Sequence, residues 1–467
     1  MALHARHTPS WPGPKGRAGM PKENWSSRLS FVLSGAALAV GVANFWRFPY
    51  LIGRYGGGTF LLAYVAVAIL FGVPLVAMEL ALGRHTRREA TGALALLAPR
   101  SPWPLLGVGF VVYEIISIGY YATVVGWMLA YAWHSATGAF AGAGMARMAR
   151  IFAATQANPV AILALDAVIL ALCGAVLVRG VTRGIERFCQ LAMPVLLALI
   201  CFLAVYGLSL PGAAGGLAFY LTPRPGTMGV EGLLEAIGQV FFSVNIGMGG
   251  WAVFGSHLSR RDPILGNALW VTGLDTAIAF LAGFVIFPAV FTFGADPGQG
   301  ASLAFVTMPA LLDKLPAGPT VSFLFFALLF LAGFASAVTS LEVAIAFAEE
   351  RLHICRRLSV PIFMIIMLLA AVPPAMAYGP WAGVRILGRN IFDFEDYLIF
   401  SISLPLMAVL LSLFVGWRWG ADAAREEINR TPGPVWVGRW WNLVIKYVAP
   451  VVIGVVLVVG VLHGLRP

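Results

Sequence analysis

The stretch Gly35–Pro49 reads GAALAVGVANFWRFP, and we expect the rest of the chain to be organised around it. It begins as an apolar helix, loses the helical pattern at Gly41–Asn44 and resumes at Phe45. Lipid cannot satisfy the peptide groups of a broken helix, so such a break is tolerated only where it is buried in protein or lines a cavity. Free carbonyl groups and a half-helix N-terminus would then form a site for a cation and a carboxylate. The alternative is a glycine-containing membrane helix that ends in an interfacial Trp46-Arg47 pair.

Composition places the chain among polytopic membrane proteins. Of its 467 residues, 60% are hydrophobic and only 11% are charged, far from the soluble range. In a soluble protein the net charge of +10 would suggest nucleic acid. Here the positive-inside bias of membrane proteins explains the charge, so we expect a lipid bilayer as partner and no nucleic acid.

Neither the cysteines nor the N-terminal residues indicate a functional site. The four cysteines show no CxxC pattern, which argues against a disulfide or metal framework; they are Cys173, Cys189, Cys201 and Cys355. Residues 1–24 are polar and lack the apolar region of a signal peptide. We expect them to form a cytoplasmic tail, followed by a single transmembrane domain over 25–467.

Apolar runs long enough to span a membrane, about 20 residues each, occur eleven times. They lie near 28–52, 58–84, 103–135, 159–179, 188–209, 232–258, 264–293, 319–348, 358–378, 397–419 and 440–464. The connection 294–318 contains a helical stretch, Ala301–Leu312, which would act as a lid or pack on the helix ends.

The distribution of Lys and Arg sets the orientation. If the N-terminus is inside, 22 of the 31 Lys and Arg residues fall in the tail and on the inner side, and nine fall on the outer side. This asymmetry predicts a cytoplasmic N-terminus, and the odd number of spans then puts the C-terminus outside the cell membrane.

A second span is interrupted in the same way as the first. The sixth segment, Ile237–Trp251, contains Asn245 and three glycines midway. Spans one and six correspond if the chain consists of two five-helix halves and one extra helix. Paired interrupted segments are typical of a transporter site at a repeat interface. The halves share no convincing similarity residue by residue, so the two breaks alone carry this inference.

Five acidic residues fall inside spans, where ionisable groups are costly: Glu79, Glu114, Asp166, Asp275 and Glu342. Asp275 lies mid-span among apolar residues, which favours ion or proton binding. Glu79 would cap backbone N–H groups of a broken helix or pair with an arginine. Glu342 could face the same interior. For Glu114 and Asp166, which have no neighbouring motif, we expect a structural hydrogen bond or an interfacial position.

The eighth span contains small residues and hydroxyls around Ala332–Ser336. Small residues allow close helix packing. Alternatively, Ser336 faces the first break and completes a set of oxygen ligands of the kind that hard cations prefer.

Seven motifs together are similar to those of the neurotransmitter:sodium symporter family. They are Asn44–Tyr50, Gly56–Phe60, Gly72–Leu75, Glu79–Arg84, Gly184–Arg187, Gln239–Ser243 and Gly420–Asn429. The resemblance covers the chain from Lys22 onward. It implies an all-α polytopic membrane protein with the leucine-transporter fold, a 5+5 inverted repeat with broken first and sixth helices plus one extra helix. It also implies sodium-coupled amino acid uptake by alternating access, in a membrane protein that is not an enzyme.

The resemblance also assigns residues to two sodium sites and two gates. The first sodium site would use the Ala39 carbonyl, Asn44, Ser243 and Asp275, with the substrate carboxylate. The second would use the carbonyls of Ala37, Val40 and Ala332 and the hydroxyl of Ser336, beside Ala335. The outer gate maps to Arg47 and Asp396, and the inner gate to Lys22 and Glu350, with Trp25 and His257 near it.

The implied substrate pocket has no catalytic residue. Its residues would be Ala39, Gly41, Ala43, Asn44, Ser117, Tyr121, Phe242, Ser243, Asn245, Met248, Ser336 and Ser340. Gly41 replaces the aspartate of monoamine carriers and leaves room for an amino acid, for which a hydrophobic or aromatic side chain is expected. Tyr121 would bind the substrate and Phe242 would cover it.

Three positions depart from the family pattern. Ala335 stands where many members offer a second hydroxyl to the second sodium ion, and Ala43 replaces a glycine of the first break. Ala279 replaces the serine of chloride-dependent members. Because Asp275 places a carboxylate one turn away, we expect transport without chloride.

Two other classes of function compete with symport. An amino acid sensor would use the same fold without significant flux, although no added soluble domain is present. An intramembrane enzyme would need a catalytic motif, and neither GxSxG, HExxH nor paired aspartates in facing spans occur. The sequence leaves the amino acid, the number of sodium ions, proton counter-transport and the oligomeric state open.

Overall fold

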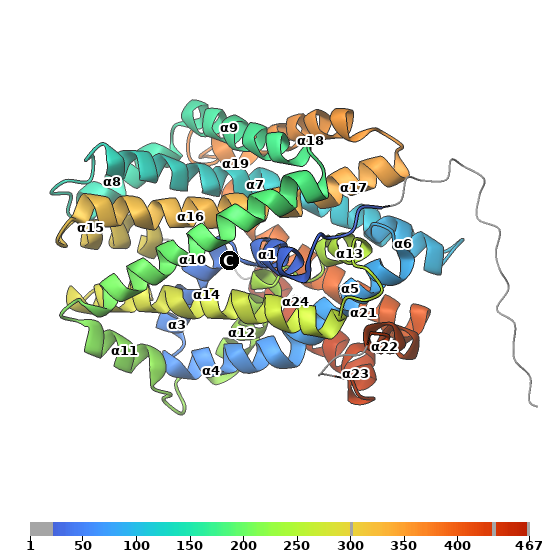
Figure 1. The fold of residues 1–467 in the computed structure, drawn as a ribbon. Helices are drawn as coiled ribbons and strands as arrows, with labels where there is room; N and C mark the ends of the chain where they lie inside the picture. The colour runs from blue at the N-terminus through green and yellow to red at the C-terminus, as the bar shows by residue number, and fades with distance from the viewer. Residues whose placement is uncertain (1–21, 299–301, 432–435, 465–467) are drawn as a thin grey trace, which may run out of the picture.

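The computed structural model describes residues 22–298, 302–431 and 436–464, and these residues form a bundle of helices. Long helices run side by side from one end of the molecule to the other, and shorter helices cover the two ends (Figure 1). Of the predicted tail, only residues 22–24 belong to the described part of the chain.

Nine helical stretches among the described residues are long and apolar enough to span a membrane. They are Gly58–Thr86, Pro104–Ala136 (α7), Pro159–Leu177 (α9), Val181–Leu208, Ile264–Thr292 (α14), Gly318–Glu350, Arg356–Met376, Ile391–Asn429 and Trp440–Leu462. The shorter helices outside these stretches include α6 (Ala90–Leu97), α8 (Met145–Gln156), α11 (Ala213–Leu221) and α15 (Met308–Leu312).

The first predicted span is broken. Helix α1 (Arg28–Ala39) ends at Val40, and the chain resumes as α2 (Val42–Phe45) and α3 (Arg47–Arg54). The two halves are bent by 64°. Gly41 has an extended backbone, with φ −141° and ψ −162°. This pair is a tenth span if its halves are counted together.

The sixth predicted span is also broken. Helices α12 (Gly229–Ser243) and α13 (Gly250–Ser256) are separated by residues 244–249. Asn245, Gly247 and Gly249 have φ values of 59°, 82° and 80°, a left-handed region that glycine adopts without steric cost. The eleven predicted segments therefore correspond to nine unbroken stretches and two broken pairs among the described residues.

The helices share one hydrophobic core that extends from Trp25 to Ile453. The predicted helical stretch Ala301–Leu312 is helical from Leu303 onward, whereas Ala301 lies outside the described residues. Phe305 is fully buried, and its ring packs on those of Trp46 and Trp127 at centroid distances of 6.0 and 5.9 Å. The stretch therefore packs on the helix ends as part of the core.

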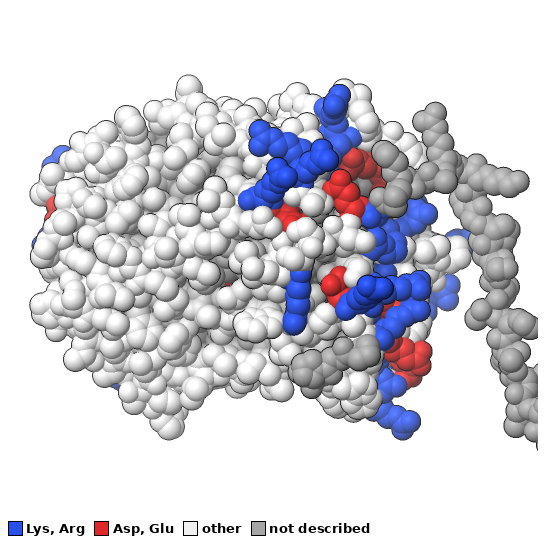
Figure 2. Space-filling view, in the orientation of Figure 1, with Lys and Arg blue, Asp and Glu red and all other residues white. Residues whose placement is uncertain are grey.

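Charge is gathered at one end of the molecule. Figure 2 shows most of the visible Lys and Arg side chains at the end that carries α6 and α22 (Ala421–Asn429) in Figure 1, while the long flank between the ends is almost free of charge. All four cysteines are free thiols, as expected.

Candidate functional site

The first break exposes main-chain oxygens. Among the described residues, no group donates a hydrogen bond to the carbonyl oxygens of Ala37, Ala39 or Val40. The amide of Gly41, which would continue α1, instead donates to Oδ1 of Asn44 at 3.0 Å. The amide of Val42 donates to the Tyr121 hydroxyl at 3.1 Å. Side chains therefore satisfy the N–H groups of the break, and its carbonyl groups stay available to a cation.

Three side chains predicted for the first sodium site meet beside this break. The Ser243 hydroxyl lies 3.0 and 2.9 Å from the two carboxylate oxygens of Asp275. The Asn44 amide donates to Ser243 at 3.1 Å and to Asp275 at 2.7 Å. All three residues are fully buried. The oxygens of Ser243 and Asp275 are hard donors that fit Na⁺, and the carboxylate offsets the charge of the ion. Asn44 turns its amide nitrogen toward them, while its Oδ1 accepts a hydrogen bond from the Gly41 amide.

The second predicted site is less complete. The Ser336 hydroxyl donates to the carbonyl of Leu38 at 3.5 Å, which places α16 (Gly318–Ser340) against the end of α1. Ala335 is fully buried and carries no oxygen in its side chain. The donors that fit a sodium ion here are the Ser336 hydroxyl and the free carbonyls of Ala37 and Val40.

A cavity of about 40 Å³ lies between the two breaks and α7. Ten of the twelve predicted substrate residues line it: Ala39, Gly41, Ala43, Ser117, Tyr121, Phe242, Asn245, Met248, Ser336 and Ser340. The other two, Asn44 and Ser243, belong to the adjacent Asp275 cluster. A Cβ atom at Gly41 would lie 2.8 Å from the Tyr121 hydroxyl oxygen, so a side chain there would displace Tyr121.

The predicted substrate set missed seven further residues that line this cavity: Leu38, Val42, Tyr113, Glu114, Ile118, Ala337 and Phe400. Phe400 packs on Phe242, with ring centroids 4.2 Å apart. For Glu114 we expected a structural hydrogen bond or an interfacial position, and this was wrong. Glu114 is buried beside the cavity and makes no hydrogen bond or ion pair with any described residue. Helical spacing could have revealed it, since Glu114 lies three residues before Ser117 and seven before Tyr121 on one helix face.

The other intramembrane carboxylates have protein partners. Glu79 accepts a hydrogen bond from the Gly247 amide at 2.7 Å, so it caps the second break rather than pairing with an arginine. The Thr123 hydroxyl donates to Asp166 at 3.2 Å. Glu342 forms an ion pair with Arg356 at 2.5 Å and does not line the cavity.

A larger cavity, of about 220 Å³, shares Phe242 with the first one. Both predicted outer gate residues, Arg47 and Asp396, line it, but they do not form an ion pair with each other. Arg47 donates to Glu235 at 2.9 Å and to Gln239 at 3.1 Å, because these acceptors on α12 are closer. Asp396 accepts a hydrogen bond from the Tyr120 hydroxyl at 2.8 Å.

The predicted inner gate pair does form, between Lys22 and Glu350. Trp25 is buried next to it and donates to the carbonyl of Phe254 at 3.1 Å. Nδ1 of His257 lies 2.7 Å from the Glu23 carbonyl oxygen, which ties residues 22–25 to the end of α13.

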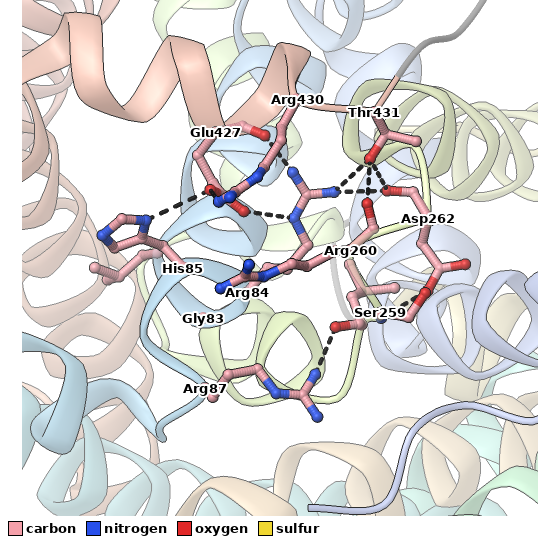
Figure 3. A network of polar contacts seen from close by, with 12 residues as sticks. Gly83, Arg84, His85, Arg87, Ser259, Arg260, Asp262, Glu427, Arg430 and Thr431 are labelled. Carbon is pink, nitrogen blue, oxygen red and sulfur yellow. Dashed lines mark hydrogen bonds and ion pairs between the residues drawn. The ribbon is translucent and has the colours of Figure 1, made fainter.

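A buried arginine links three further segments at the same end (Figure 3). Nε of Arg84, at the end of α5 (Val73–Thr86), donates to Oε1 of Glu427 in α22 at 2.8 Å. Its Nη1 donates to the carbonyl of Asp262 at 2.7 Å and to the Thr431 hydroxyl at 3.1 Å. Two family-like motifs 343 positions apart, Glu79–Arg84 and Gly420–Asn429, therefore meet in one network.

Comparison with known proteins agrees with this arrangement. The model of the sodium:neurotransmitter symporter family matches residues 22–149 and 152–466. The chain belongs to this family. Membership in this transporter family confirms that the chain is a multi-pass membrane transporter and not an enzyme.

Several members of the symporter family are similar over most of their length. The uncharacterized sodium-dependent transporter YhdH of Bacillus subtilis is 32% identical and aligns over 94% of this chain and 98% of its own. The human sodium- and chloride-dependent creatine transporter 1 is 26% identical over 89% of this chain and 73% of its own.

A solved structure confirms the fold. The crystal structure of MhsT in complex with L-phenylalanine is 36% identical and superposes with a TM-score of 0.85, over 95% of this chain and 100% of that one. The leucine-transporter fold expected from the motifs is therefore correct.

Proposed function

We propose that this protein is a symporter that carries an amino acid into the cell together with sodium by alternating access. The observation that carries the proposal is the convergence of free carbonyl groups at the first break with the buried Asn44–Ser243–Asp275 cluster, directly beside a cavity. Family membership and the sodium-dependent relatives support it.

Two sodium ions are proposed, one at each set of oxygen ligands. The first set is the Ala39 carbonyl with Asn44, Ser243 and Asp275, and the second is the carbonyls of Ala37, Val40 and Ala332 with Ser336. Moving one charge across 100 mV is worth about 2.3 kcal/mol, which drives accumulation. To contribute to this cycle, sodium must bind the outward-facing state more tightly than the inward-facing state.

The proposed substrate is an amino acid with a hydrophobic or aromatic side chain. Phe242, Met248 and Phe400 supply apolar walls, and the amino acid carboxylate would complete the first sodium site. The similar protein MhsT was solved in complex with L-phenylalanine, which supports an aromatic side chain in the substrate.

The orientation proposed for the chain has its N-terminus in the cytoplasm and its C-terminus outside. The gathering of Lys and Arg at one end supports it (Figure 2). Lys22 and Glu350 then form the inner gate, while Arg47 and Asp396 form the outer gate.

Chloride independence is part of the proposal. The Tyr64 hydroxyl donates to Asp275 at 3.3 Å and the Ser243 hydroxyl donates to the same carboxylate at 2.9 Å. These two hydroxyl donors are thus directed at a built-in negative charge. Replacing chloride with gluconate should leave uptake unchanged; chloride stimulation of the wild type that is lost in Asp275→Asn would contradict this.

The test is uptake of a mixture of labelled amino acids into proteoliposomes with an inward sodium gradient, compared with a potassium control. Accumulation above equilibrium that requires sodium is expected, and the accumulated species identifies the substrate. Binding without accumulation would favour the sensor, and sodium-independent uptake would overturn the coupling.

A matched pair of serines tests the ion site. Ser243→Ala should lower the apparent sodium affinity by about 10- to 100-fold, because a hydrogen bond or ligand to a charged group is worth about 1.5–3 kcal/mol. Ser256 is equally buried, but its hydroxyl bonds to the Val253 carbonyl of its own helix at 2.6 Å. Ser256→Ala should therefore leave the sodium affinity unchanged.

A further inference from the structure

Glu114 differs from the other intramembrane carboxylates. It lies on α7, is only 2% exposed and lines the cavity between the two breaks. Among the described residues, no backbone or side-chain group donates a hydrogen bond to it, and no cation pairs with it. Glu79, Asp166 and Asp275 each accept at least one hydrogen bond.

A buried carboxyl group without a donor is costly. Taking it out of water is unfavourable unless hydrogen bonds or an opposite charge replace the lost hydration. The polar neighbours in the cavity do not supply them. The Asn245 amide already donates to the Leu38 carbonyl at 3.1 Å and to Ser340 at 3.2 Å. The Tyr113 hydroxyl, which also lines the cavity, is buried and has no hydrogen-bond partner among the described residues, so it does not donate to Glu114 either. A molecule that enters the cavity can supply the donor that Glu114 lacks.

The lining of the cavity also indicates what kind of side chain carries that donor. Ile118, Phe242 and Met248 line it with apolar atoms, and Glu114 shares its helix face with Ser117 and Tyr121. Tyr121 and Gly41 mark the end of the cavity near the first break, where the Val42 amide donates to the Tyr121 hydroxyl. Glu114, two helical turns from Tyr121, lies toward the opposite end of this helix face, where a long side chain would terminate.

We propose that Glu114 binds the end of the substrate side chain and selects an amino acid whose apolar side chain terminates in an N–H donor. This inference rests on the proposed function and specifies the chemistry at the end of the substrate side chain. The N–H group belongs either to an aromatic ring such as indole or to an alkylammonium group. Phenylalanine and leucine, which lack such a donor, would leave Glu114 unpaired in the occupied cavity.

Two pairs of amino acids isolate the donor. Tryptophan and 1-methyltryptophan differ in the ring N–H, and lysine and norleucine differ in the terminal ammonium. We expect sodium-dependent binding of the donor-bearing member of at least one pair to be about tenfold tighter or more, because a site built around a hydrogen bond rejects an analogue that lacks it. The pair that shows the preference identifies the source of the N–H group.

Variants at Glu114 show whether this residue causes the preference. Glu114→Met, which keeps the side chain long but removes the acceptor, should abolish the preference and strengthen binding of the member without the donor. Glu114→Gln keeps an acceptor oxygen and loses the charge, so it should retain an indole preference and lose an ammonium preference.

Asp166→Asn is the matched control, because Asp166 is another buried carboxylate but does not line the cavity. It should leave the preference unchanged. If Glu114→Met binds all substrates more weakly by the same factor, or if neither pair shows a preference, the inference is overturned. Sodium-dependent uptake of other amino acids in that case would leave the proposed function intact, whereas its absence would remove both.

Discussion

The two proposed gates differ in how their charged residues are paired. At the proposed outer gate, Arg47 and Asp396 line a cavity of about 220 Å³, and each is held by another partner. At the proposed inner gate, Lys22 pairs directly with Glu350, and Arg84 joins α5 to α22 at the same end of the molecule. The residue pair of the proposed outer gate is therefore apart, whereas that of the proposed inner gate is formed.

This difference indicates how the protein would alternate. The outer gate residues are partly exposed, with side-chain exposures of 32% for Arg47 and 34% for its partner Glu235, so exchanging one partner for another costs little. Arg84, by contrast, is fully buried and has four acceptor groups. We expect the outer gate to respond to substrate and the Arg84 network to remain formed.

The largest expected effect is at Arg84. Arg84→Met should lower the free energy of unfolding by about 3–5 kcal/mol, because it leaves the buried Glu427 carboxylate without its main partner. Thermal unfolding of the purified protein measures this change. Arg430→Met removes a half-exposed partner of the same carboxylate and should cost about 1 kcal/mol or less. If both variants lowered the free energy of unfolding equally, burial would not explain the strength of the Arg84–Glu427 contact.

A smaller effect is expected at the inner gate. Glu350→Gln removes the charge that pairs with Lys22, and both side chains are 21% exposed. The inward-facing population should rise by about fivefold or less, as for a partly exposed pair worth at most about 1 kcal/mol. Reactivity of a cysteine introduced into the inner pathway reports this shift. Glu349→Gln is the control, since Arg356 keeps Glu342 as a partner.

The smallest expected effects are those of two substitutions at the proposed outer gate, which should change the substrate dissociation rate in opposite directions. Glu235→Gln releases Arg47 from its present partner and should favour closure, whereas Asp396→Asn removes the partner expected after closure and should oppose it. Each shift should be about twofold to fivefold in the substrate dissociation rate, as for exposed pairs of about 0.5–1 kcal/mol. Two shifts in the same direction would argue against an exchange of partners at Arg47.

Both helix breaks could be predicted from local sequence. Asn245, Gly247 and Gly249 interrupt an apolar segment, and glycine tolerates the left-handed backbone that the structure shows there. Asn44 was assigned to the first sodium site only through the resemblance, and the structure then placed it against Asp275. The resemblance therefore selected the residues, and the geometry brought them together.

The partners of charged residues could not be predicted in the same way. Glu79 had two possible partners in the sequence, and the choice between them depended on where the Gly247 amide lies after folding. Glu114 carried no motif, so only its place on the cavity wall distinguished it from Asp166.

The sequence by itself determined that the chain is a helical membrane protein, where its spans lie and which two of them break. These properties depend on hydrophobic length and backbone freedom, which neighbouring residues specify. Only the tertiary structure decided that Lys22 pairs with Glu350 while Arg47 and Asp396 stay apart, and which acceptors hold Arg84. It also decided which carboxylate faces the cavity without a partner among the described residues. Hydrogen bonds and ion pairs between residues hundreds of positions apart depend on distances of a few ångströms, and those distances exist only once the helices have packed.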